Sequence, residues 1–145
     1  MEVQFTFGDP KTQIRTIALD RMVTRLLPRF QPAAVRQKSF IINDVPPDFY
    51  VDTDKEILAA AISSLFVSFI SRTHNSCIRV TAKRYNNIVL LRLKDANTGF
   101  TSVSDYNWQE ARSLAAKLGG CVIIDDMYQK SATITLSFRC EANAA

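Results

Sequence analysis

Two periods of hydrophobic and polar residues run along this chain, and they predict its secondary structure. Apolar residues three and four positions apart predict helices with one buried face, whereas strict alternation predicts strands. Helical spacing covers residues 11–30, a segment from a cap at Asp52 or Thr53 to about Arg72, and residues 108–118. Strand patterns cover residues 3–7, 38–43, 49–51, 77–84, 88–95, 121–125 and 132–139.

Proline, glycine and asparagine mark where these elements are expected to end. Pro28 and Pro32 are predicted to close the first helix, because proline removes a backbone donor and restricts the preceding residue. Asn86-Asn87 is typical of a tight hairpin turn. Gly119-Gly120 predicts the stop of the third helix.

The predicted order is strand, helix, strand, strand, helix, strand, strand, loop, helix, strand, strand. Each helix has one apolar face, which a two-layer arrangement would bury. We therefore expect an α+β two-layer sandwich, in which one mixed, mostly antiparallel sheet carries three helices on one face. A length of 145 residues suits a single domain over residues 1–145.

The composition narrows the possible partners. Hydrophobic residues make up 47% and charged residues 22% of the chain, as in ordinary globular proteins. The net charge of +4 is spread along the chain, and its densest spot is Lys83-Arg84, followed by Arg92 and Lys94. Without a longer basic run interleaved with aromatics, this spot is typical of a solvated strand face. No nucleic-acid partner is expected.

Cysteine spacing and hydropathy favour a reduced, cytoplasmic protein. Cys77, Cys121 and Cys140 are widely spaced and form no CxxC pair, so neither a metal nor a disulfide framework is predicted. The first residues lack a signal-peptide pattern. The longest apolar stretch, residues 57–70, is too short to span a bilayer, and no direct membrane contact is expected.

Several segments, in their shared order, resemble the ATP-binding domain of sensor histidine kinases and the wider GHKL superfamily. The matching segments are Phe40 to Asp54 before the main helix, Asp54 to Leu58 leading to Ser64 to Ser68 as the N box, Asp95-Ala-Asn-Thr-Gly99 as the aspartate–glycine box, and Lys117 to Cys121 followed by Lys130 to Leu136 as the closing elements. The resemblance spans nearly the whole chain and implies the fold described above.

In that family, ATP sits between the main helix, a lid loop and the sheet. The resemblance implies that Asp95 would accept a hydrogen bond from the adenine amine. The positions that carry over are Asp95, Gly99 and Thr133, which are kept; Asn97, which replaces a glycine; Ser64 and Ser68, which replace asparagines that hold magnesium and phosphate; and Ser71, which replaces a lysine. Residues 100–118 contain no glycine, so the glycine-rich box before the third helix is absent and the lid is short.

These replacements weaken the phosphate end of the expected site. A hydrogen bond to a charged group contributes about 1.5–3 kcal/mol, so losing two or three donors and a lysine removes on the order of 5 kcal/mol. That free energy corresponds to roughly a thousandfold in affinity. We therefore expect no cofactor, with ATP and magnesium remaining possible ligands if the site is active. The serines also have a packing interpretation, as small residues that permit close helix contacts. Asp95 could likewise be a simple turn residue at the end of a strand.

Three functions follow as hypotheses. The first is a bacterial-type signalling module, a pseudo-ATPase that binds a protein such as a response regulator or a dimer mate. The second is a divergent kinase that binds ATP and phosphorylates a histidine or serine in trans. The third is a histidine phosphotransferase. It would depend on His74, the only histidine, whose neighbourhood is predicted to be a surface turn.

Overall fold

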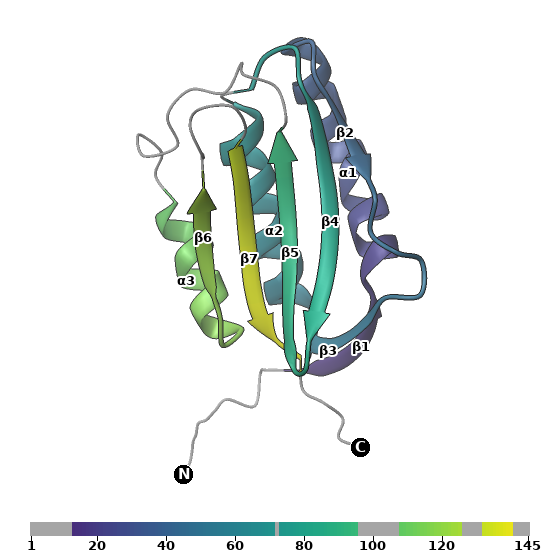
Figure 1. The fold of residues 1–145 in the computed structure, drawn as a ribbon, viewed down its shortest axis with the longest axis vertical. Helices are drawn as coiled ribbons and strands as arrows, with labels where there is room; N and C mark the ends of the chain where they lie inside the picture. Colours follow the sequence, from purple (N-terminus) through teal and green to yellow (C-terminus); the bar gives the residue numbers. More distant parts are fainter. Residues whose placement is uncertain (1–12, 72, 96–107, 126–131, 141–145) are drawn as a thin grey trace.

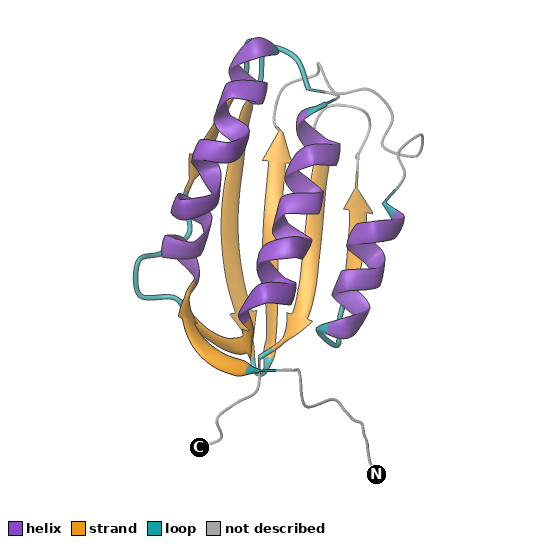
Figure 2. Ribbon diagram, turned by 180° about the vertical axis from the view of Figure 1, so that it is seen from behind, coloured by secondary structure: helices purple, strands orange, loops and turns teal. Residues whose placement is uncertain are grey.

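A computed structural model of the protein describes residues 13–71, 73–95, 108–125 and 132–140. Three helices cover one face of a five-stranded sheet, which gives the two layers expected from the sequence (Figures 1 and 2). In chain order the elements are β1 (Ile14–Ala18), α1 (Leu19–Arg36), β2 (Phe40–Asn43), β3 (Tyr50–Asp54), α2 (Lys55–Ile70), β4 (Cys77–Tyr85), β5 (Ile88–Asp95), α3 (Gln109–Lys117), β6 (Cys121–Asp125) and β7 (Ala132–Arg139). The strand predicted over residues 3–7 lies outside the described residues.

The larger sheet has the strand order β2-β4-β5-β7-β6. Its β2–β4 pair is parallel and its other pairs are antiparallel, so the prediction of a mixed, mostly antiparallel sheet is confirmed. The prediction that all strands share one sheet was wrong. β1 pairs with β3 in a separate two-stranded sheet, with Ile17 opposite Val51.

Two side chains link the small sheet to the large one. Arg84, near the end of β4, donates to the carbonyl oxygen of Tyr50 in β3 and lies over the Phe49 ring, 5.5 Å from its centroid. The Sγ atom of Cys140, just after β7, accepts from the backbone N–H of Asp52 at 3.2 Å. Cys140 is 3% exposed, so this contact between the sheets is buried, whereas Arg84 and Tyr50 are exposed.

The first helix differs from its prediction at both ends. Residues 14–18, expected to be helical, form β1 because pairing with β3 satisfies their backbone groups. At the other end, α1 continues through Pro28 and Pro32 to Arg36. Both prolines lie four residues apart on the exposed side, where the helix can open slightly toward water.

The second helix begins within two residues of its predicted cap. Its N-cap is Asp54, whose Oδ1 atom accepts from the backbone N–H groups of Glu56 and Ile57 at 3.0 and 3.1 Å. These bonds satisfy two donors that a helix start otherwise leaves open. Asp52 and Thr53 belong instead to β3.

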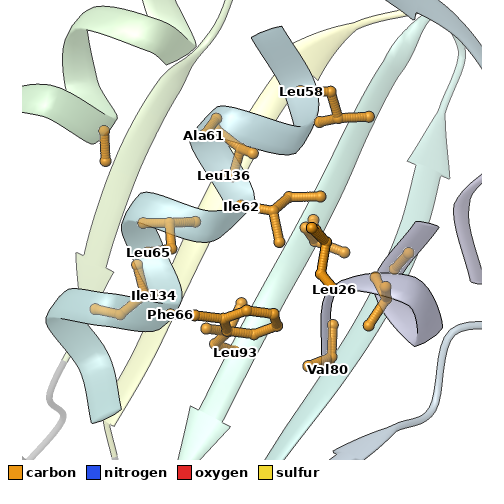
Figure 3. Close-up of a cluster of buried hydrophobic side chains, with 14 of the residues drawn as sticks. Leu26, Leu58, Ala61, Ile62, Leu65, Phe66, Val80, Leu93, Ile134 and Leu136 are labelled. Carbon is orange, nitrogen blue, oxygen red and sulfur yellow. The ribbon is translucent and has the colours of Figure 1, made fainter. Parts of the chain in front are cut away.

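The core lies between α2 and the large sheet. α2 projects large apolar side chains toward the strands (Figure 3). Phe66 is fully buried and packs its ring 5.3 Å from that of Phe30 in α1. The other residues labelled in this cluster are Leu26, Leu58, Ala61, Ile62, Leu65, Val80, Leu93, Ile134 and Leu136.

The predicted stop after the third helix is confirmed, and the structure gives each glycine its reason. Gly119 has a φ angle of 77°, which L side chains rarely adopt. A Cβ atom on Gly120 would lie 1.7 Å from the carbonyl oxygen of Ser137 in β7. The first glycine therefore ends α3, while the second lets the chain pass close to the sheet. The predicted Asn86 turn is also present, with φ at 55°.

Candidate functional site

The outer face of α2, away from the sheet, lines a hollow of about 510 Å³. We call it the serine hollow. Its described lining consists of Ala59, Ala60, Ser63, Ser64, Val67 and Ser68 from α2, Leu26 and Arg29 from α1, and Glu110 from α3. The hollow thus lies over the central helix, with the two flanking helices as its walls.

Helix periodicity places Ser64 and Ser68 in this hollow together. Residues four apart in an α-helix are neighbours on one face, so both hydroxyl groups point into the same space. Each of the two serines is half-buried. Of the three residues between them, Leu65 and Phe66 are fully buried against the sheet, while Val67 is exposed and also lines the hollow. The same turn of helix therefore supplies both the core and the polar wall of the hollow.

Ser71 does not share the hollow with the other two serines. It is the exposed C-cap of α2, and its Oγ donates to the carbonyl oxygen of Ser68 at 3.0 Å. The hydroxyl thus provides a hydrogen-bond donor for one of the carbonyl groups that the end of a helix leaves unpaired. In the structure the side chain therefore has a structural partner within its own helix.

Asp95 is the last residue of β5 and is fully buried. It lies opposite Ile78 in β4 and Ala132 in β7. Residues directly opposite one another in antiparallel strands share a face, so its side chain lies on the helix-facing side of the sheet. The end of β5 and the end of α2 lie at the same end of the domain (Figure 1). Asp95 does not line the serine hollow.

Thr133 lies on the other face of the sheet. It is opposite Lys94 in β5 and Asp125 in β6, both of which are exposed. Its neighbour Ala132 occupies the position beside Asp95 instead. The structure therefore does not bring Thr133 and Asp95 together around one ligand. Asn97 and Gly99 lie outside the described residues.

His74 is exposed and lies between α2 and β4, in the surface position that the sequence predicted. Its backbone carbonyl accepts from the Ser76 hydroxyl at 2.9 Å.

All three cysteines are free thiols. Within the described ranges, no three His, Cys, Asp or Glu side chains gather as metal ligands would. Of the helices that the structure describes, none is long and apolar enough to cross a bilayer.

The charges at the rim of the serine hollow nearly cancel. Arg29 on one wall and Glu110 on the other are both exposed, and the described α2 residues between them carry no charge. Sequence reasoning missed both residues. A signal for Arg29 was present, because Arg21, Arg25 and Arg29 repeat every four residues along one side of α1.

Solved structures of histidine kinases have this arrangement of elements. The Acinetobacter baumannii histidine kinase AdeS superposes with a TM-score of 0.76 at 12% identity, over 90% of this chain and 68% of that one. The catalytic domain of the histidine kinase ThkA, in a nucleotide-free form, superposes with a TM-score of 0.74 at 11% identity, over 88% of this chain and 97% of that one. This chain has the histidine-kinase-like ATPase fold. The fold that the sequence resemblance implied is therefore confirmed.

The histidine-kinase-like fold is also present in ThkA bound to the response regulator protein TrrA. That kinase superposes with a TM-score of 0.72 at 9% identity, over 92% of this chain and 44% of that one. Neither a protein-family model nor a curated protein matches the sequence. Sequence identities this low support a shared fold only, so the function has to be argued from the residues of this chain.

Proposed function

We propose that the domain is a signal-transduction module that keeps the ATP-binding fold of sensor histidine kinases and uses it for protein contacts. The observation that supports this function most directly is the composition of the outer face of α2. Its wall of the serine hollow consists of serine, alanine and valine. In the resemblance drawn from the sequence, this face is where asparagine amides and a lysine would hold magnesium and phosphate.

The chemistry of the hollow argues against strong triphosphate binding. Serine hydroxyls are short and uncharged, and magnesium requires oxygen ligands in near-octahedral geometry. The described rim offers one guanidinium, on Arg29, and sets the Glu110 carboxylate against it. A polyphosphate entering this space would find almost no net positive charge, so little would offset the loss of its hydration.

Calorimetric titration of the folded domain with ATP and magnesium tests the proposal. We expect a dissociation constant weaker than about 1 mM, which corresponds to a binding free energy of about −4 kcal/mol. Thermal unfolding gives a second readout, because a ligand at its dissociation constant raises the unfolding free energy by only about 0.4 kcal/mol. A micromolar dissociation constant would rule the proposal out.

A matched variant identifies what limits ATP binding. Ser64→Asn combined with Ser68→Asn restores two amides at half-buried positions. Two hydrogen bonds to charged phosphate would tighten magnesium–ATP binding by at least about tenfold. Ser64→Gln with Ser68→Gln is the control, because its longer amides cannot repeat that geometry.

The position of Asp95 favours a second function, a divergent kinase that phosphorylates a partner in trans. Its carboxyl group is fully buried on the helix-facing side of the sheet, at the end of β5. If this group binds adenine, Asp95→Asn abolishes phosphotransfer while leaving the domain folded. ATP hydrolysis or phosphotransfer with this sensitivity would select the kinase over the interaction module. A cytoplasmic location is part of either proposal.

A further inference from the structure

A second hollow, of about 390 Å³, lies between β1, α1 and the start of α2. We call it the basic hollow. Four cationic side chains line it: Arg15 from β1, Arg21 and Arg25 from α1, and Lys55 from α2. All four are exposed, so their charged groups are available to a partner. Among the described residues that line this hollow, none is acidic.

The basic hollow has an apolar floor. Ile17 and Met22 are each 6% exposed and Leu26 is 8% exposed, and all three line it from below the charged rim. Leu26 and Ala59 also line the serine hollow, so the two hollows meet along the α1–α2 boundary. Together they form one elongated groove, apolar at the floor of its basic end and lined by the α2 serines and Glu110 at its other end. Its α1 side carries Arg21, Arg25 and Arg29.

The start of α2 adds little to the attraction that the basic lining would exert on anions. Asp54 already caps that end by accepting from the N–H groups of Glu56 and Ile57, so two of the first backbone donors are occupied. The attraction must come from the side chains themselves. Arginines four residues apart lie about 6 Å apart along the axis of α1. Carboxylates four residues apart on a second helix repeat with the same spacing.

We propose that this groove binds an acidic, amphipathic helical segment of a partner protein. The partner's apolar stripe would lie on Leu26 and Ala59, while glutamates or aspartates along its edges pair with the arginines of α1. This inference rests on the proposed interaction module and names its contact surface and its partner class.

Other anionic occupants fit the groove less well. A small free anion favours a compact, buried cluster of donors, and these cations are exposed along a groove. A single-stranded nucleic acid uses aromatic platforms, and no aromatic side chain is among the described residues lining either hollow. A bilayer surface is flat, so it cannot reach a floor that lies between two helices. A second copy of this chain has a net charge of +4 and brings repulsion.

Fluorescence anisotropy with a synthetic probe tests the proposal. The probe is a labelled helical peptide of about 18 residues, or five turns, with leucines on one face and glutamates four apart beside them. A second peptide with glutamine in place of every glutamate has the same shape without the charge. We expect the acidic peptide to bind at least about tenfold more tightly, and less tightly as salt is raised. Equal affinity for both peptides would overturn the proposal.

Two charge-matched variants locate the binding face. Arg21→Glu with Arg25→Glu reverses two charges on the groove and should weaken binding of the acidic peptide by at least about tenfold. Lys83→Glu with Lys94→Glu reverses two exposed charges on the opposite sheet face and should weaken it by less than about threefold. Equal losses would mean nonspecific attraction to a basic protein, and would overturn the assignment.

A third variant tests the floor without changing charge. Ala59→Trp places an indole where the two hollows meet, so it should block the peptide while circular dichroism and the melting temperature report a folded domain. Unchanged affinity in this variant would contradict the proposal. So would anionic vesicles or duplex DNA that bind the groove more tightly than the peptide does. The peptide assay contains no nucleotide, so the two proposals fail separately. Micromolar ATP binding would overturn the proposed interaction-module function alone. An acidic peptide that does not bind would overturn the proposed partner of the groove alone.

Discussion

The inner face of α2 carries leucine, isoleucine and phenylalanine against the sheet (Figure 3). Its outer face carries alanine, serine and valine beside solvent. Phe66 is fully buried, whereas the next residue, Val67, is 60% exposed. Both faces belong to one continuous helix with one N-cap, Asp54. The packing that selects the fold and the surface that selects a ligand can therefore change independently.

This independence accounts for the low identity to solved structures of the same fold. The sheet requires apolar volume from α2 at every turn, and many combinations of apolar residues fill that volume. Side chains on the outer face do not fill the core. An amide at such a position can therefore be replaced by a hydroxyl without loss of the fold. A shared histidine-kinase-like architecture at 11–12% identity is thus compatible with a different ligand.

The largest expected effect is a truncation on the inner face. Phe66→Ala removes a fully buried ring that packs against Phe30, and should lower the free energy of unfolding by about 3–5 kcal/mol. Val67→Ala, on the outer face, should change it by no more than about 0.5 kcal/mol. Urea unfolding of both variants measures the difference. Equal losses would mean that the two faces are not energetically distinct.

A polar group placed on the inner face gives the next effect. Ala61→Ser adds a hydroxyl at a fully buried position in the apolar core, where water cannot reach it. The expected loss is about 1–3 kcal/mol of unfolding free energy. Ala60→Ser, one residue earlier on the exposed side, is the control and should lie near the wild type in thermal unfolding.

Removing the cap that serves both faces should have an intermediate effect. Asp54→Ala leaves the N–H groups of Glu56 and Ile57 without their acceptor and should cost about 1 kcal/mol. Asp54→Asn keeps a side-chain oxygen at the cap and should retain most of that stability. Chemical denaturation distinguishes the two. An Asn variant as unstable as the Ala variant would assign the effect to the charge of Asp54 or to the bond that its Oδ2 accepts from the Gln13 N–H, rather than to capping.

The smallest effect is expected on the outer face itself. Ser64→Ala with Ser68→Ala should shift the unfolding free energy by no more than about 0.5 kcal/mol, because both hydroxyls are half-buried and alanine has the higher helix propensity. Differential scanning calorimetry measures the shift. A loss above about 2 kcal/mol would show that the serines hold the helices together, which is the packing interpretation.

The sequence predicted local features well where one residue type had one physical role. Alternation set β5 at Ile88–Asp95, and Gly119 stopped α3 because glycine adopts its φ angle without the strain that a side chain would add. Spacing of four placed Ser64 and Ser68 together, since helix geometry alone decides which residues share a face. These features depend on neighbours within a few residues.

Contacts between distant segments were beyond the reach of the sequence. The hydrophobic spacing of residues 14–18 predicted a helix. These residues form β1 instead, because β3 lies alongside and pairs with their backbone groups. The resemblance assigned Asp95 and Thr133 to one nucleotide site, and the register between β5 and β7 places Thr133 on the other face of the sheet. The groove likewise exists only because β1 and α1 pack against the start of α2 and gather Arg15, Arg21 and Lys55. Local patterns fix the periodicity of each element, but register and packing depend on the free energy of the whole assembled core.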